Sequence, residues 1–521
     1  MQPSRSGELP AALRAEWTKF RTVRGWMIGL VFAALMVVLF TFLQAHGKNE
    51  TFCTTPNPSS CVAGHPNVPT GPSGEAVTDT YEFVAKRLTG DGTITARITS
   101  LAGRVWAGPA NEAPSLAHTR LGLTSWTKAG LLVTPSTRQG SAYAAVMATG
   151  GRGIRFQYDY ADDQGGLPGS ISSTAPRWLR LTRTGDTIIG YDSSDGTTWH
   201  PVGSAQLAGL PATLYVGLFA TSPTTSEGLA TQATASFDHI AIGPRADGEA
   251  QAAPGSWHGA SIGTGPKDFY TTLGKGGYRQ ARDSIVVTGS GDIAPAVASA
   301  GGDTASDSLL FGLVVALIVL IVIGTMFITS EYRRGLIRTT FAATPERGRV
   351  LAAKAVVIGG VGFVVGALAS AVAIPLAEHV MRANGDYIFP AGSLTVVRVI
   401  VGSGLLVALT ALAVLGIGTI LRGSAGAILV GVVVFVLPTF TGPGIIGPTA
   451  SGGAATWLYR VTPAAGFSML GLLPRSGLVS YPYTMANGYY PLPPWAGLLV
   501  LVAYATAALL AARAVLRRRD A

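Results

Sequence analysis

Residues 309–328 read LLFGLVVALIVLIVIGTMFI, an uninterrupted apolar run without a charged side chain. A helix of that length crosses the roughly 30 Å hydrocarbon core of a bilayer. Residues 329–340 then read TSEYRRGLIRTT, so the run ends in charged side chains that cannot enter hydrocarbon. This junction predicts a membrane-spanning helix followed by a segment at the membrane surface.

Several other runs share this apolar character. The chain has 521 residues, of which 48% are hydrophobic and only 13% are charged, whereas soluble globular proteins carry about 25% charged residues. Besides 309–328, the runs are 26–43, 355–376, 399–421, 425–440 and 495–516. The sequence therefore predicts a membrane α-helical protein with six transmembrane helices, placed at 26–44, at 308–329 and within 355–516.

The first apolar run is predicted to be a retained transmembrane helix rather than a secretory signal peptide. It exceeds the roughly 7 to 15 residues of a signal-peptide core, and no convincing cleavage site of small residues follows it. Residues 1–25 precede it and combine apolar and basic side chains at helical spacing, among them Trp17, Lys19, Phe20 and Arg21. We expect a short helix in contact with lipid at the membrane surface. The alternative is a frayed basic tail that only fixes orientation.

Positive charge beside the apolar runs decides the predicted orientation. Lys and Arg close to helix ends collect on the cytoplasmic side of membrane proteins. The basic clusters lie before the first run, within 330–354, at Arg422 and in the tail 517–521, all on one side of a six-helix arrangement. We therefore expect a protein of the cell membrane with both termini cytoplasmic and with residues 45–307 outside the cell.

Residues 45–307 contain no comparable apolar run and predict a large inserted all-β domain. Short stretches of alternating polarity separated by turn residues are typical of a β-sandwich, which we place at about 77–243. The step Asp195-Gly196 is a strong hairpin signal. Further β structure is expected at 255–295, and whether it completes the same sandwich stays open.

The two cysteines, Cys53 and Cys61, are too few and too isolated for a zinc site. An oxidising exterior permits a disulfide between them, which would close a short loop and stabilise the fold by roughly 2 to 3 kcal/mol. A pair of unlinked thiols is the alternative.

Several function classes are disfavoured. The net charge is +10, but the basic residues are not gathered with aromatic residues into one domain, so nucleic acid is not an expected partner. The sequence has no phosphate-binding Gly-x-x-x-x-Gly-Lys-Ser/Thr loop, and no cofactor is expected; ATP would have to be hydrolysed by a separate chain. The inserted domain has carboxylates of the type that glycosidases use, but a polar loop and a turn explain them more simply. They are Asp159, Asp162, Asp163, Asp192 and Asp195, with the loop expected at 162–166 and the turn at 192–196.

Three segments carry a resemblance to a transporter family. Residues 16–24 look like the opening of actinobacterial type-2 ABC permeases, and residues 329–354 resemble the cytoplasmic segment after their second transmembrane helix. Residues 458–466 are similar to the last outer loop of those permeases. The resemblance implies an ABC ATPase subunit as partner, together with a homodimer or a second permease chain. It makes residues 330–354 the cytoplasmic coupling segment that receives motion from the ATPase, with the contact at Glu331, Tyr332, Arg333, Gly335 and Arg338. The alternative is that the basic residues there only anchor the membrane orientation.

The inserted domain carries a second resemblance. Residues 177–181, 191–199 and 214–218 resemble the concanavalin-like, laminin-G-like sandwich modules of bacterial surface proteins, which implies a possible carbohydrate partner. Function does not follow from such a fold alone. The leading hypothesis is an ATP-driven export permease for a hydrophobic or amphipathic compound. The runner-up is a membrane-anchored carbohydrate-binding or sensing protein, and a hydrolase comes third.

Overall fold

A computed structural model shows two compact units, and each is described by itself. The helical unit comprises Met1–Asn49, Asp303–Arg475 and Tyr483–Ala521, and the β unit comprises Glu50–Gly302 and Ser476–Pro482. The structure describes residues 8–47, 52–53, 61–62, 68–109, 112, 114–166, 168, 175–243, 256–264, 273–297, 304–343, 346–441, 453–480, 483, 485 and 488–518.

Five helices of the helical unit are long and apolar enough to cross a membrane, within the described residues. They are α2 (Arg24–Gly47), α3 (Ala305–Arg333), α5 (Arg347–Asn384), α6 (Ser393–Leu421) and α10 (Pro494–Arg518). The shorter elements are α1 (Glu8–Thr22), α4 (Leu336–Ala343), α7 (Ser424–Phe435), α8 (Leu437–Thr441), α9 (Gly453–Val461) and the 3-10 helix η3 (Pro463–Leu470). The prediction of several helices long and apolar enough to span a membrane is thereby confirmed.

The expected fifth transmembrane helix, 425–440, forms two short helices. Helix α7 ends at Phe435 and α8 starts at Leu437. Pro438 has no backbone N–H to continue the helical hydrogen bonding, which accounts for a break nearby. The apolar segment Ser424–Phe440 is therefore shorter than the five long helices. The count of six transmembrane helices stays a prediction.

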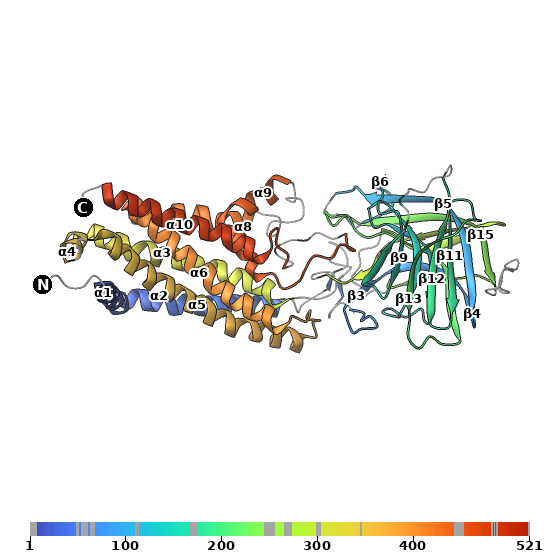
Figure 1. Cartoon of the computed structure of the whole chain (residues 1–521), viewed down its shortest axis with the longest axis horizontal. Helices are drawn as coiled ribbons and strands as arrows, with labels where there is room; N and C mark the ends of the chain where they lie inside the picture. Colours follow the sequence, from blue (N-terminus) through green and yellow to red (C-terminus); the bar gives the residue numbers. More distant parts are fainter. Residues whose placement is uncertain are drawn as a thin grey trace. The chain divides into compact units, whose positions relative to one another are not determined.

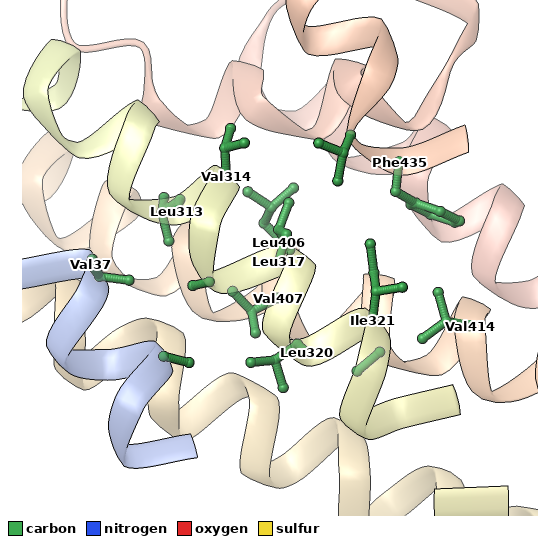
Figure 2. Close-up of a cluster of buried hydrophobic side chains, with 14 of the residues drawn as sticks. Val37, Leu313, Val314, Leu317, Leu320, Ile321, Leu406, Val407, Val414 and Phe435 are labelled. Carbon is green, nitrogen blue, oxygen red and sulfur yellow. The ribbon is translucent and has the colours of Figure 1, made fainter. Parts of the chain in front are cut away.

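The core of the helical unit lies where α2, α3, α6 and α7 meet. Figure 2 shows Val37 of α2, Leu317 of α3, Leu406 of α6 and Phe435 of α7 among the side chains of this cluster. All four are buried. Branched and aromatic side chains from four helices fill the space between the backbones, so these helices form one packed body.

Glycine lets α5 and α6 cross closely. A Cβ atom on Gly366 would lie 2.8 Å from the Ser403 carbonyl oxygen, and one on Gly404 would lie 2.8 Å from the Phe363 carbonyl oxygen. Either methyl group would force the two backbones apart. Gly360 differs, because a Cβ atom there would meet nothing within 4 Å. Gly360 therefore takes no part in this crossing.

The β unit is a sandwich of two mainly antiparallel sheets. The order of the first sheet is β10 (Asp162–Gly165), β9 (Ile154–Tyr158), β8 (Ala144–Thr149), β7 (Lys128–Thr134), β14 (Thr213–Thr221), β4 (Tyr81–Thr89) and β16 (His258–Ile262). The order of the second is β13 (His200–Gln206), β12 (Thr187–Ser193), β11 (Arg177–Thr184), β5 (Gly92–Trp106), β15 (Thr231–Gly243), β18 (Ser284–Gly289) and β17 (Gly277–Gln280), with β6 (Thr119–Leu121) paired to β5. Two further pairs are β1 (Phe52–Cys53) with β2 (Cys61–Val62), and β3 (Val77–Asp79) with β19 (Ile293–Pro295).

The alternation of polarity matches the two faces of these strands. Along β5, Ile94, Ala96 and Ile98 are buried between the sheets, whereas Arg97 points away from that core. The Asp195-Gly196 hairpin is confirmed, because β12 pairs with β13 and Gly196 has a φ of +77° in the connecting turn. Such a backbone favours glycine.

Three features of the β unit go beyond the sequence expectations or correct them. The strands within 255–295 add to both sheets, so this region completes the same sandwich. Asp162–Gly165 is a strand paired to β9 rather than a polar loop, because its backbone bonds the sheet edge despite its polar side chains. The chain also returns to this unit at Ser476–Pro482, where the Gly477 carbonyl oxygen accepts a hydrogen bond of 2.9 Å from Trp126 Nε1.

Candidate functional site

Two of the three segments that carry the transporter resemblance, 16–24 and 329–354, meet at one end of the helical unit. Figure 1 shows α1, α4 and the C-terminal end of α10 at this end. The Arg347 guanidinium, at the start of α5, donates a hydrogen bond of 2.9 Å to the Leu516 carbonyl oxygen of α10. Arg422, at the end of α6, lies 5.2 Å from the Tyr332 ring centroid of α3. The basic clusters therefore gather around one end of the bundle.

A glycine turn separates α3 from α4. Gly335 has a φ of +68°, and its N–H donates to the Tyr332 carbonyl oxygen at 3.2 Å. A side chain is strained in this left-handed conformation, so glycine is the natural residue to end α3. The turn frees the chain to begin α4 in a new direction. Within the described residues, the expected coupling segment, 330–354, thus contains the end of α3, this turn, α4 and the first turns of α5.

Four charged side chains form a cluster at this end, which we call the ion cluster: Glu16, Lys19, Glu331 and Lys354. Lys354 Nζ lies 2.6 Å from Glu16 Oε2 and 2.7 Å from Glu331 Oε1. Lys19 Nζ lies 2.8 Å from Glu16 Oε1 and 3.2 Å from Glu331 Oε1. Two ammonium groups therefore alternate with two carboxylates, and the cluster has no net charge. It connects α1, α3 and α5.

Burial makes the ion cluster energetically important. Lys354 is fully buried at 0% exposure, and Glu16 and Glu331 are also buried, whereas the Lys19 side chain is 40% exposed. Removing one partner from such a buried set leaves an uncompensated charge, which typically costs about 3–5 kcal/mol. Lys19 also donates to Thr340 Oγ1 at 3.4 Å, which extends the connection to α4. Any movement of α4 relative to the bundle would disturb this network.

Aromatic rings pack against the apolar side of the ion cluster. The Lys354 ammonium lies 4.4 Å from the ring centroid of Phe327, close enough for a cation–π attraction. The Phe327 ring contacts Phe20 edge-on, with centroids 5.4 Å apart, and contacts Trp26 in the same way at 5.3 Å. These rings exclude water from one side of the cluster, which strengthens the charge interactions there.

The surroundings of Lys19 favour its charged form. Burial by itself lowers the pKa of an ammonium group. The hydrogen bond and charge of Glu16, together with the charge of Glu331, outweigh that effect, so the pKa of Lys19 is raised above its ordinary value. Lys19 therefore stays protonated at neutral pH, as the alternation of charges in the cluster requires.

The structure brings together only part of the predicted contact set. Glu331 enters the ion cluster, whereas Arg333 is exposed and Gly335 forms the turn. The Tyr332 hydroxyl is buried without a hydrogen-bond partner among the described residues. Arg338 lies on α4, and its side chain falls outside the described part.

The residues predicted for the interfacial helix separate onto different faces of α1. Lys19 points into the ion cluster and Phe20 into the core, whereas Trp17 and Arg21 are exposed. Cys53 and Cys61 are opposite one another in the register of β1 and β2, but their side chains lie outside the described residues. The disulfide stays a prediction.

Sequence reasoning missed Glu16, Thr340 and Lys354 as members of this site. A signal existed for Glu16, because it lies three residues before Lys19 on one helix and such pairs meet. For Lys354 the sequence offered only its place in a basic segment. Its burial depends on α1, which precedes it by more than three hundred positions.

Three carboxylates of the β unit, Asp163, Asp192 and Asp195, have structural roles. The Arg177 guanidinium pairs with the buried Asp192, and the Arg155 guanidinium pairs with Asp163. Asp195 accepts backbone hydrogen bonds of 2.8 and 2.7 Å from Thr197 and Thr198 in the hairpin turn. Within the described residues, no group of three His, Cys, Asp or Glu side chains is placed to hold a metal ion.

Comparisons with known proteins identify no family. No protein-family model matches the chain, and no curated protein matches its sequence. Solved structures with some similarity include scytalido-glutamic peptidase with a transition-state analogue inhibitor, at 9% identity and a TM-score of 0.26 over 40% of this chain and 98% of that chain. The same peptidase with a peptide-based transition-state analogue is 10% identical, with a TM-score of 0.25 over 40% of this chain and 98% of that chain. A functionally unknown protein from Saccharomyces cerevisiae is 15% identical, with a TM-score of 0.20 over 35% of this chain and 86% of that chain. At these TM-scores the likenesses carry no argument about fold or activity.

Proposed function

We propose that this chain is the membrane-spanning permease subunit of an ATP-driven exporter of the type-2 ABC class. Six transmembrane helices, with α7 and α8 as part of the fifth, move a hydrophobic or amphipathic compound outward across the cell membrane. A separate ATPase subunit supplies the energy, and two permease chains enclose the pathway. The termini lie in the cytoplasm and the β unit lies outside the cell.

The ion cluster is the observation that carries this proposal. A coupling element must be rigid enough to transmit a push and must be connected to helices that move. Helix α4 follows the turn at Gly335, and Thr340 of α4 bonds Lys19 of the cluster. Through the cluster, a force on α4 reaches α1, α3 and α5 together. A segment that served only as a positive anchor would need no such buried network.

Charge placement supports the orientation. The basic clusters gather around the end of the bundle that carries α4, as the positive-inside rule requires of a cytoplasmic end. The chain leaves this end along α2 and returns to it along α3, so the β unit is inserted at the opposite ends of these two helices. An insertion there is expected to face the other compartment.

Purification of the full chain from its native membranes in mild detergent tests the proposal. We expect an ATPase with a Walker-type phosphate loop to co-purify. The double variant Arg333→Glu/Arg334→Glu reverses two exposed charges beside the turn and should abolish this association. The matched control, Arg517→Glu/Arg518→Glu on α10, should retain it. A stable, intact complex without any ATPase would overturn the proposal.

A hollow on the first sheet favours a second candidate function, a membrane-anchored carbohydrate-binding protein. It measures about 550 Å³, and Phe83, Arg87, Tyr215 and His258 are among its lining residues. Aromatic rings next to polar groups suit the apolar faces and hydroxyls of a sugar. Binding of the full chain in nanodiscs to a glycan array, lost in Tyr215→Ala, would support this function. Absence of any glycan binding would count against it.

A further inference from the structure

An open apolar groove lies between α1, α2 and α5 in the helical unit. It has a volume of about 640 Å³, and every side chain that lines it is apolar. Trp17 of α1, Val31 of α2 and Leu368 of α5 are among its lining residues, and all three are exposed. Gly360 adds to the opening, because a Cβ atom there would meet nothing. In a membrane protein, such a groove faces hydrocarbon.

The length of the groove matches one leaflet of a bilayer. Its α5 side extends from Val356 to Leu368, which at 1.5 Å per residue corresponds to about 18 Å. One leaflet contributes roughly 15 Å, half of the hydrocarbon core of about 30 Å. The groove therefore fits an acyl chain that descends from the leaflet surface where α1 lies.

Positive charge lies beside the groove, on α1 and at the start of α2. Arg14 precedes Trp17 by three positions on α1 and Arg21 follows it by four, so both are neighbours of Trp17 on the helix surface. Arg24 begins α2 nearby. All three arginines are exposed, and they have no ion pair among the described residues. Guanidinium groups bind phosphate oxygens well.

This charge argues against a second copy of the chain as the occupant. A two-fold interface built on this groove would bring the arginine-bearing surface of one α1 toward the same surface of the other. Like charges across an interface are unfavourable. An anionic headgroup would instead neutralise them.

We propose that the groove binds one acyl chain of an anionic phospholipid, whose headgroup lies at Arg14, Arg21 and Arg24. The proposal requires only that the chain is a membrane protein, so it does not depend on the transport function. The lipid covers Trp17 and fills the space beside Gly360. Lys19 takes no part, because it points into the ion cluster.

Fluorescence quenching of Trp17 tests this binding. The full chain is placed in phosphatidylcholine nanodiscs that contain increasing fractions of phosphatidylglycerol with brominated acyl chains, or of brominated phosphatidylcholine. Because the chain has 9 tryptophans, the signal of Trp17 is taken as the difference between the native protein and Trp17→Phe. We expect brominated phosphatidylglycerol to reach half-maximal quenching at a lipid fraction about ten-fold or more below that needed with brominated phosphatidylcholine. The reason is that each arginine near an anionic surface strengthens binding by about five-fold.

Three variants sharpen the test. Arg14→Gln/Arg21→Gln should remove the preference for the anionic lipid, and Arg517→Gln/Arg518→Gln on α10, with the same change in charge, should retain it. Gly360→Leu adds a side chain where a Cβ atom meets nothing within 4 Å, and it should weaken quenching by both lipids. Equal quenching by the two lipids in the native protein would overturn the proposal. A preference for the anionic lipid that persists in Arg14→Gln/Arg21→Gln would also overturn it. The same holds if Trp17 is not quenched and two copies of the chain cross-link at the groove.

Discussion

At the scale of single residues, the ion cluster connects charged side chains of three helices. Two carboxylates and two ammonium groups share five contacts with each other and with Thr340, at distances from 2.6 to 3.4 Å. Buried ion pairs add little net stability relative to apolar packing, but breaking one is costly. The cluster therefore specifies how α1 docks rather than stabilising the bundle by a large amount.

Lys354→Met tests this reasoning. The variant leaves two carboxylates to share the single charge of Lys19, so one buried negative charge is not neutralised, and we expect a loss of stability of about 3 kcal/mol or more. Lys354→Met/Glu331→Gln restores neutrality and should recover much of that loss. Thermal unfolding in detergent, with Arg518→Gln as an exposed-charge control, measures both. Equal melting temperatures for native protein and Lys354→Met would contradict the prediction.

A single carboxyl group of the β unit gives a second residue-scale prediction, on pH. Burial raises the pKa of Asp79 to about 7, although the Gly140 N–H donates to its Oδ2 at 2.9 Å and opposes the shift. The folded state then binds a proton that the unfolded state releases above its ordinary pKa of about 4. Stability therefore falls as pH rises from about 4 to about 7, by up to about 1.4 kcal/mol per pH unit.

Asp79→Asn isolates this effect, because the amide keeps an acceptor for Gly140 and does not titrate. The difference in unfolding free energy between Asp79→Asn and the native protein should grow in favour of the variant between about pH 4 and 7. Unfolding of the full chain in nanodiscs, followed by the fluorescence of the β unit, provides the measurement. A difference that stays constant with pH would show that Asp79 is ionised throughout.

At the scale of elements, the crossing of α5 and α6 depends on two glycines. Gly404→Leu would place a Cβ atom 2.8 Å from the Phe363 carbonyl oxygen, so the helices must separate. Overpacking of this kind typically costs about 1–3 kcal/mol. Gly360→Leu on α5 is a matched control that meets open space and should leave the melting temperature unchanged or slightly raised. Similar losses for both variants would show that helix packing does not distinguish these positions.

At the scale of the whole molecule, the proposed function depends on which compartment each unit faces. With Cys53 and Cys61 replaced by Ser, single cysteines at Arg334 and Thr197, both exposed, report on the α4 end and on the β unit. A membrane-impermeant maleimide added to intact cells should label Thr197→Cys and should reach Arg334→Cys only after lysis. Labelling of both positions in intact cells would remove the basis for an ATPase acting on α4.

The sequence by itself determined the class of molecule. Uncharged apolar runs can satisfy their backbone only as helices in a membrane, and alternating polarity in 77–243 can bury one face only as paired strands. These constraints are local, so α2, α3, α5, α6 and α10 could be predicted from the length and apolar composition of their runs. The hairpin at Gly196 was equally local, because its backbone conformation favours glycine.

Only the tertiary structure decided which residues meet. From the sequence, Lys354 is one more positive charge in a basic segment, and only the fold shows that α1 places Glu16 against it. The strands within 255–295 likewise joined both sheets by pairings that no local pattern encodes. Sequence period specifies which face of an element is apolar, but the partner of that face is chosen by packing between segments far apart in the chain.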